Sequence, residues 1–366
     1  MSEELIQLMK PNIGNDEIEL VKEVIDSGYL VEGPKVREFE ELIKSYLNVK
    51  HAISCTSWTT GAEMVFRAIG LEEGDEVICP DFTHPATALA VITAGGTPVL
   101  VDVDLESRNT TAEIISEALT DKTKAIQPVS IFGNPVDVDP INSLAKEKNL
   151  FVVDDAACTL GSEYKGKPVG SLVDFTIFSF HPRKVFTCGD GGLITTNNDN
   201  LAERLQSMKV FGAENGKFKN WGTNQRMSNV HGALLLGQIR RLEEIVNDRI
   251  QKAKVYNKLL KDVNGIKIPK IDKHSKSNYQ TYAVFLERDN IRNEIIKKMR
   301  EKNIQTQIGT YAIHKQPFLE SVKTVGNLAN SYKLQENLLS LPLHYALSAR
   351  DQERVVFELV EILSNI

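Results

Sequence analysis

The chain has 366 residues, more than one hydrophobic core usually holds, which predicts two domains or one large domain with an appendage. Hydrophobic residues make up 42% of the sequence and charged residues 25%, which are ordinary values for a soluble globular protein. The formal net charge of −6 does not indicate a protein that binds nucleic acid, but it does not exclude local positive sites that bind small anions.

The sequence also bears on cellular location. It opens without a charged-then-apolar signal segment, and no apolar run is long enough to span a membrane. Cys55, Cys79, Cys158 and Cys188 show no CxxC spacing, so we expect reduced and mostly buried thiols. We therefore expect a cytoplasmic protein that has no membrane partner and no metal site.

The first half of the chain alternates helical and strand-like segments. Helical periodicity predicts helices over residues 15–28, 35–48, 60–71, 86–96 and 138–149. Short apolar runs rich in β-branched and aromatic residues predict strands over residues 72–80, 97–104, 123–133, 150–157, 174–180 and 191–197. Such alternation predicts an α/β fold with a mostly parallel sheet that helices cover on both faces.

The second half has a different pattern. A long helix is predicted over roughly residues 228–262, followed by a strand at 281–287 and helices at 289–303 and 351–366. We therefore expect a large α/β domain over residues 1–249 and a smaller α+β domain over residues 250–366.

The stretch FSFHPRKVFTCGDGG, residues 178–192, carries the strongest sign of chemistry. A strand ends in a His-Pro-Arg-Lys cluster, and a glycine-rich loop follows directly. Active sites of open α/β sheets form at the carboxyl ends of strands, so Lys184 stands where a reactive group is expected. Other strand ends and a helix start carry polar residues as well, namely Asp154, Asp155, His84, Thr59 and Thr60.

Together these residues match the needs of pyridoxal 5′-phosphate (PLP). A lysine can bind the aldehyde covalently, and a carboxylate can keep the pyridine nitrogen protonated so that the ring accepts electrons. A planar side chain can pack on the ring, while backbone amides and hydroxyls at a helix start can hold the phosphate. The sequence therefore predicts a PLP enzyme.

Longer motifs resemble the DegT/StrS family of sugar aminotransferases, which has the aspartate-aminotransferase fold (fold type I) of PLP enzymes. The family segments SFHPTKxxTTGEGG, EDAAQALG and NYRMSELQAALGLAQL correspond here to SFHPRKVFTCGDGG, DDAACTLG and NQRMSNVHGALLLGQI. The opening KPNIGNDEIELVKEVIDSGYLVEGPKVREFEELI and the late TYAIHKQP and LSLPLH also match. The likeness covers nearly the whole chain in order.

The resemblance implies roles for individual residues. Lys184 would be the lysine that binds the cofactor, and Asp155 would pair with the pyridine nitrogen. Ser179, Thr59 and Thr60 would hold the phosphate. Asn224 would reach the phosphate of a neighbouring subunit, which implies a homodimer with shared active sites.

Three positions depart from the family pattern. His84 stands where the family often has Trp, Tyr or Phe on the ring, and a planar imidazole can still stack. Cys158 replaces the Gln or His that approaches the phenolic oxygen, and a thiol is a weak donor. Trp58 stands where the family often has Gly beside the phosphate.

Each assignment has a structural alternative. A lone lysine is normally a solvated surface charge, and a carboxylate such as Asp155 is often a helix cap or turn residue. His84 could be a packing histidine, the two threonines could be ordinary caps, and the loop at 189–192 is mainly a hairpin turn. Asp154 is expected to be a structural acid. His181 and His314 either line the substrate cavity or are structural, and Arg226 lies at the substrate or at an interface.

The resemblance implies an aminotransferase that moves an amino group from L-glutamate to a keto sugar, and we expect that sugar to be nucleotide-linked. One alternative is a PLP-dependent sugar dehydratase of the same family, in which a histidine replaces the lysine; the presence of Lys184 argues against it. The other is a non-catalytic regulatory member, against which both Lys184 and Asp155 argue.

Overall fold

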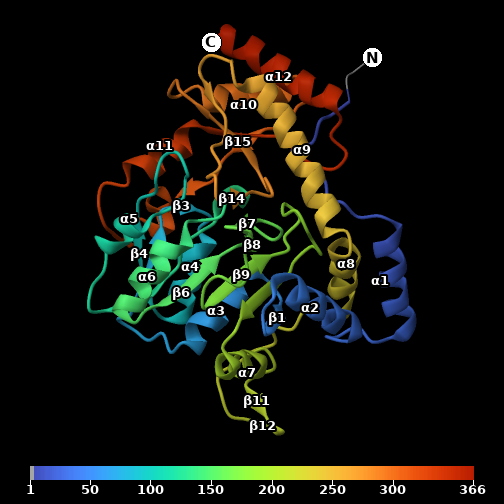
Figure 1. Cartoon of the computed structure of the whole chain (residues 1–366), viewed down its shortest axis with the longest axis vertical. Helices are drawn as coiled ribbons and strands as arrows, with labels where there is room; N and C mark the ends of the chain where they lie inside the picture. The colour runs from blue at the N-terminus through green and yellow to red at the C-terminus, as the bar shows by residue number, and fades with distance from the viewer. Residues whose placement is uncertain (1–3) are drawn as a thin grey trace.

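A mostly parallel sheet forms the centre of the molecule (Figure 1). The computed structural model describes residues 4–366, and within them this sheet has eight strands in the order β1-β10-β9-β6-β5-β2-β4-β18. Their bounds are His51–Cys55 (β1), Gly192–Thr196 (β10), Phe175–Ser179 (β9), Phe151–Asp155 (β6), Thr123–Ile126 (β5), Glu76–Pro80 (β2), Thr97–Val101 (β4) and Lys323–Thr324 (β18). Among these described strands β10 alone runs opposite to its neighbours. The predicted α/β class is confirmed.

Helices cover both faces of this sheet. They are α2 (Pro34–Leu47), α3 (Trp58–Ala68), α4 (Ala86–Ala94), α5 (Ala112–Ser116), α6 (Val138–Lys148), α7 (Asp199–Met208) and α8 (Asn229–Ile239). The first helix, α1 (Asn15–Ser27), packs against α8 instead of the sheet. Successive side chains of β9 point to opposite faces: Ile177 packs with α3 and α4, whereas Phe178 packs with α2 and α8. Both faces are therefore removed from water, which explains why the strands are almost continuously apolar.

Strands that follow the long helix α9 (Leu242–Leu260) in the chain form a second sheet. Its strands are antiparallel and follow the order β13 (Ile266–Lys267), β15 (Tyr282–Leu286), β19 (Leu338–Leu341) and β16 (Gln307–Ile308). Helices α10 (Arg292–Glu301) and α12 (Ala349–Ser364) share its core, which also takes in Ile6 from the start of the chain. The division into residues 1–249 and 250–366 stays a prediction, and its boundary falls inside α9.

Short elements tie the C-terminal part of the chain back to the central sheet. β18 lies beside β4, and β17 (Tyr311–Ala312) pairs with β3 (Phe82–Thr83). The remaining elements are β7 (Glu163–Tyr164), β8 (Lys167–Pro168), β11 (Ala213–Glu214), β12 (Lys217–Phe218), β14 (Ser275–Lys276), α11 (Ala329–Asn337) and 3-10 turns at Ile131–Gly133, Ile313–Lys315 and Pro317–Leu319. These pairings bring residues after 300 close to the ends of the central strands.

Two sequence-based predictions differ from the structure. The helix predicted over 228–262 is divided into α8 and α9 at Arg241, whose backbone leaves the helical conformation and whose side chain donates to the carboxylate of the fully buried Glu17 at 2.6 Å. The strand predicted over 123–133 ends at Ile126, because Pro128 has no N–H for the ladder and a 3-10 turn follows. The other predicted elements exist, with ends shifted by a few residues.

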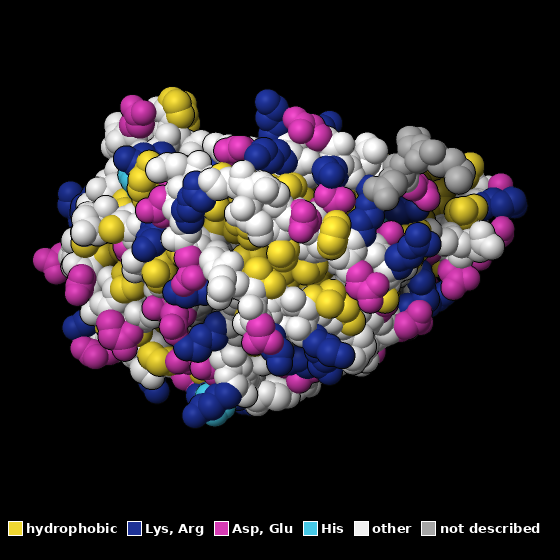
Figure 2. Space-filling model, turned by 90° about the horizontal axis from the view of Figure 1, so that it is seen from above, with side chains coloured by type: hydrophobic (Ala, Val, Ile, Leu, Met, Phe, Trp, Pro, Cys, Tyr) yellow, Lys and Arg dark blue, Asp and Glu magenta, His cyan; other side chains and the backbone are white. Residues whose placement is uncertain are grey.

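The surface charges and the cysteines agree with what the composition indicates. Figure 2 shows basic and acidic side chains interspersed on the face seen from above, which gives that face no large field of one sign. All four cysteines are free, and three of them are buried. No helix in the described residues 4–366 has the length and apolarity needed to cross a membrane.

Arg249 of α9 generates a test of how this helix is fastened to the second sheet. Its guanidinium is buried and donates to the carbonyls of Tyr279, Gln280 and Leu343 at 2.7–3.2 Å. We expect Arg249→Met to lower the free energy of unfolding by about 3 kcal/mol, because it leaves buried carbonyls without donors. Denaturant unfolding measures this loss. The exposed Arg288, with one bond to Ile366, provides the matched control Arg288→Met, and equal losses in both variants would contradict the account.

Candidate active site

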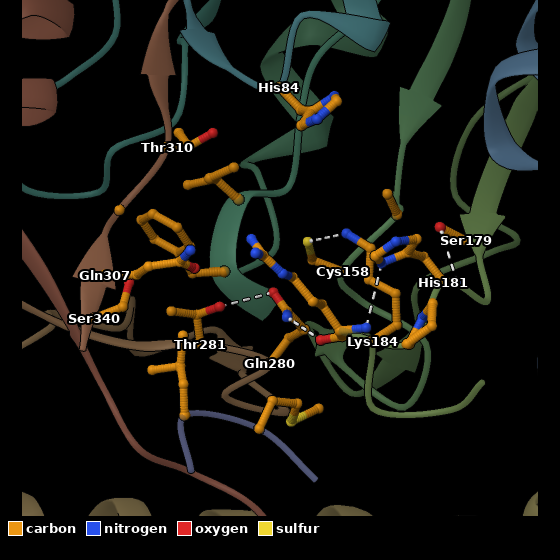
Figure 3. Close-up of a pocket in the computed structure, with 18 of the residues that line it drawn as sticks. His84, Cys158, Ser179, His181, Lys184, Gln280, Thr281, Gln307, Thr310 and Ser340 are labelled. Atoms are coloured by element: carbon orange, nitrogen blue, oxygen red, sulfur yellow. Dashed lines mark hydrogen bonds between the residues drawn. The ribbon is translucent and has the colours of Figure 1, made fainter. Parts of the chain in front are cut away.

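A cavity of about 930 Å³ opens at the carboxyl ends of the central strands. Its walls come from the loops after β3, β5, β6 and β9, from the start of α3, and from residues 305–311 near the second sheet. Figure 3 shows Lys184, His181 and Ser179 on one side and Thr281, Gln307 and Ser340 on the other. The site is therefore built by both sheets.

Asp155 ends β6 and is a buried acid of this cavity. Its side chain is 5% exposed, and its carboxylate accepts hydrogen bonds from Thr87 Oγ1 at 2.9 Å and from the backbone N–H of Ala157 at 3.2 Å. Burial raises the pKa of Asp155 to about 6, while the bond from Thr87, the charge of Lys184 and the Ala157 amide oppose that rise. A cationic group in the cavity would stabilise its ionised form further.

The neighbouring Asp154 points away from the cavity, as alternation along a strand requires. Ser130 Oγ donates to it at 3.3 Å. Burial, and then the charge of Asp155, raise the pKa of Asp154 to about 8, so this side chain is mostly neutral at pH 7. These contacts fit the structural role expected for Asp154.

Lys184 lies in the turn after β9 and faces the loop after β6. Its Nζ donates to Cys158 Sγ at 3.2 Å, and its backbone N–H donates to His181 O at 2.8 Å (Figure 3). Gln280 Nε2 holds the same turn by donating to the carbonyl of Arg183 at 2.8 Å. The amine is thus presented to the cavity by a backbone that is fixed from two sides.

The start of α3 supplies hydroxyls and free amides to the same cavity. Ser57 caps the helix by accepting from the Thr60 N–H at 3.2 Å, and Thr60 Oγ1 accepts from the Ser57 N–H at 3.1 Å. Ser57, Trp58 and Thr59 line the cavity, whereas Thr60 does not. The Trp58 indole donates to Ile177 O at 3.1 Å, so this side chain also fastens α3 to β9. Such a helix start suits a phosphate group.

His84 stands at the opposite wall, just before α4. Its ring meets that of Tyr311 edge to face, with centroids 6.2 Å apart. Burial and then the positive charge of Lys184 lower the pKa of His84, with smaller contributions from His181 and Arg183. At neutral pH the imidazole is therefore uncharged and offers a flat face.

The structure brings most of the predicted site residues together. The residues that line the cavity are Lys184, Asp155, Ser179, Thr59, His84, Cys158 and His181. Thr60, His314, Asn224 and Arg226 do not line it. His314 instead pairs with the buried Asp81 at 2.7 Å.

Asn224 and Arg226 lie on a different surface. Arg226 Nε donates to Asn224 Oδ1 at 3.1 Å, and Arg226 borders a separate hollow with Tyr29 and Glu32. Their predicted roles in a neighbouring subunit's site remain predictions.

Sequence reasoning missed two residues that support the site. Thr87, the donor to Asp155, lies three positions after His84, so the helical spacing of these two polar residues at the start of α4 was an available signal. Gln280 gave no signal, because its bond to the turn before Lys184 joins segments 97 residues apart.

Comparisons with known proteins agree with this geometry. Residues 11–360 match the family described as the DegT/DnrJ/EryC1/StrS aminotransferase family. The chain is 33% identical to GDP-perosamine synthase from Caulobacter vibrioides, over 98% of each chain, and 32% identical to UDP-4-amino-4-deoxy-L-arabinose--oxoglutarate aminotransferase from Shewanella sediminis, over 100% of each. The aminotransferase TlmJ from Streptoalloteichus hindustanus has a similar structure, with a TM-score of 0.94, 29% identity and 99% of each chain covered.

Thr87 offers a direct test of the electrostatics at Asp155. We expect Thr87→Val to raise the pKa of Asp155 further above its ordinary range, because the lost hydroxyl stabilises the ionised carboxylate. The acid would then take up its proton at higher pH, which carbon-detected NMR titration of labelled aspartate carboxyls measures. The control Thr195→Val removes another buried hydroxyl, which donates to Gly170 O at 2.7 Å, and should leave the titration of Asp155 unchanged. An unchanged pKa in Thr87→Val would contradict the account.

Proposed function

Because the chain belongs to the DegT/DnrJ/EryC1/StrS aminotransferase family, we propose that it transfers an amino group from L-glutamate to a nucleotide-linked keto sugar. It is a PLP-dependent enzyme of that family. The observation that carries the proposal is that the buried carboxylate of Asp155 and the amine of Lys184 open onto one cavity. The relatives named for GDP- and UDP-linked sugars support the nucleotide-linked acceptor.

The residues of the cavity fit PLP. Asp155 is held so that a cationic ring nitrogen would stabilise its charge, and Lys184 stands on a fixed turn with its amine toward the cavity. The free amides at the start of α3, with Thr59 and Ser179, would hold the phosphate, and His84 would lie on the ring. When bound, PLP supplies an electron sink that stabilises negative charge on the substrate carbon that loses its proton.

The chain's own residues would then orient the substrates and move protons. Lys184 Nζ would take the proton from Cα of the amino donor as general base, and would later deliver a proton to the sugar carbon that gains the amine. Asp155, kept ionised by its hydrogen bonds and by the ring nitrogen, would hold the proton on that nitrogen. Cys158, beside Lys184, would meet the phenolic oxygen as a weak donor.

We further propose a cytoplasmic homodimer with shared active sites. Asn224 and Arg226 do not line the cavity of their own chain, and the family resemblance assigns Asn224 to a neighbour's phosphate. In an isologous dimer each chain would supply these residues to its partner. The product, an amino sugar, would serve surface polysaccharide or related glycan synthesis, as the name of a relative from Bacillus subtilis, spore coat polysaccharide biosynthesis protein SpsC, suggests.

The donor half of the reaction tests the proposed function. Purified protein loaded with PLP should be yellow, and L-glutamate should remove the visible band while one 2-oxoglutarate forms per subunit. Lys184→Ala should lose both responses, and Asp155→Asn should lose activity by several orders of magnitude, because an amide cannot stabilise the charged ring nitrogen. A panel of nucleotide-linked 3-keto and 4-keto sugars then identifies the acceptor. Near-normal turnover of either variant would overturn the assignment.

Subunit mixing tests the shared site. Lys184→Ala and the double variant Asn224→Ala, Arg226→Ala should each be nearly inactive alone. After dissociation and joint reassociation, random pairing makes about half of the dimers mixed. Each mixed dimer has one intact active site out of its two. Roughly a quarter of full activity should therefore return. If subunit exchange is demonstrated and no activity returns, these residues act within their own chain.

A further inference from the structure

The cavity has more positive charge than the cofactor would use. The charged side chains that line it, histidines aside, are Asp155, Asp190, Arg183, Lys184 and Arg300. In the proposed function Asp155 and Lys184 engage the cofactor. Two arginines and one acid then remain for substrates. Arg300 lies on α10, a different element from the turn that carries the amine of Lys184. Arg183 is the cation that directly adjoins Lys184.

The backbone of Arg183 is fixed while its side chain has no partner. Its N–H donates to His181 Nδ1 at 3.3 Å, and its carbonyl accepts from Gln280 Nε2 at 2.8 Å. Thr281 Oγ1 in turn donates to Gln280 Oε1 at 3.0 Å (Figure 3). Within residues 4–366 the guanidinium makes no hydrogen bond or ion pair, and the residue is exposed in the cavity.

The charge of Arg183 affects two histidines of the cavity. Burial and then Lys184 lower the pKa of His84 and of His181, and Arg183 contributes to the lowering at both imidazoles. His84 and His181 belong to loops after different strands and both line the cavity. Arg183 thus lines the same cavity as Lys184, its neighbour in the chain, and as both imidazoles.

The chemistry of the two substrates decides which of them Arg183 serves. Cα of L-glutamate must reach Lys184 Nζ, and that carbon carries a carboxylate, so the donor brings an anion next to the reacting atom. The phosphates of a nucleotide-linked sugar are separated from the reacting carbon by the sugar ring. A guanidinium presents a planar fork of donors that matches a carboxylate with two parallel hydrogen bonds.

We propose that Arg183 binds the carboxylate next to the reacting carbon of the amino donor. This inference rests on the proposed function, and it assigns a role to the residue that replaces threonine in the related SFHPTK segment. The keto sugar, which has no carboxylate at the reacting carbon, would use the same cavity without this contact.

Equilibrium binding to the PLP-loaded protein tests the proposal. The probes are glutarate, a dicarboxylate without an amine, and the nucleoside diphosphates UDP and GDP, all measured by calorimetry. Arg183→Thr should weaken glutarate binding about ten- to hundred-fold, the loss typical of a removed charge-assisted hydrogen bond, and leave UDP and GDP within about twofold. Arg183→Lys should keep part of the affinity because it keeps the charge. Arg350→Thr, at an exposed position of α12 outside the cavity, is the matched control and should bind all probes as the parent protein does.

Several outcomes would overturn the proposal. They are a parent protein that binds no glutarate, glutarate affinity that is equal in Arg183→Thr and the parent, a loss confined to UDP or GDP, and a loss of PLP itself from Arg183→Thr. Circular dichroism establishes that the variants fold. Failure of the proposed function is distinguishable: a parent protein that binds glutarate through Arg183 but keeps its visible band with L-glutamate has the carboxylate site without the transfer reaction.

Discussion

Burial of the Asp155 carboxylate works against its charge, and the groups that oppose this cost come from separate parts of the chain. Thr87 reaches it from the start of α4, Ala157 from the loop after β6, and Lys184 from the turn after β9. Parallel strands bring these loops to one edge of the sheet, which is where sites in open α/β sheets form. The order of strands in the central sheet therefore brings together the groups that stabilise the ionised carboxylate of Asp155.

The second sheet completes the site by restraining the turn that carries the amine. Gln280 holds the carbonyl next to Lys184, and Arg249 of α9 holds the carbonyl of Gln280. A buried cation on a long helix therefore connects the packing of the second sheet with the position of the reactive turn.

Hydrophobic patterning puts Lys184, Asp155 and His84 at strand ends or a helix start, and the family resemblance adds Cys158. All four line the cavity, and their roles stay predictions. The sequence leaves the places of Thr60 and His314 open between the cavity and a structural role. Thr60 Oγ1 accepts from the Ser57 N–H at the start of its own helix, and His314 pairs with Asp81, which is 233 positions away. The sequence does not predict the break between α8 and α9, where Arg241 meets the distant Glu17. Contacts between remote segments leave no periodic trace in a sequence.

The central claim is that Lys184 is the residue to which the cofactor attaches. Borohydride reduction of the PLP-loaded protein, followed by proteolysis and mass spectrometry of the peptides, locates the attachment directly. The account predicts one phosphopyridoxyl group, on the peptide that contains Lys184, in each subunit. Attachment at a different lysine, with the Lys184 peptide unmodified, would contradict it.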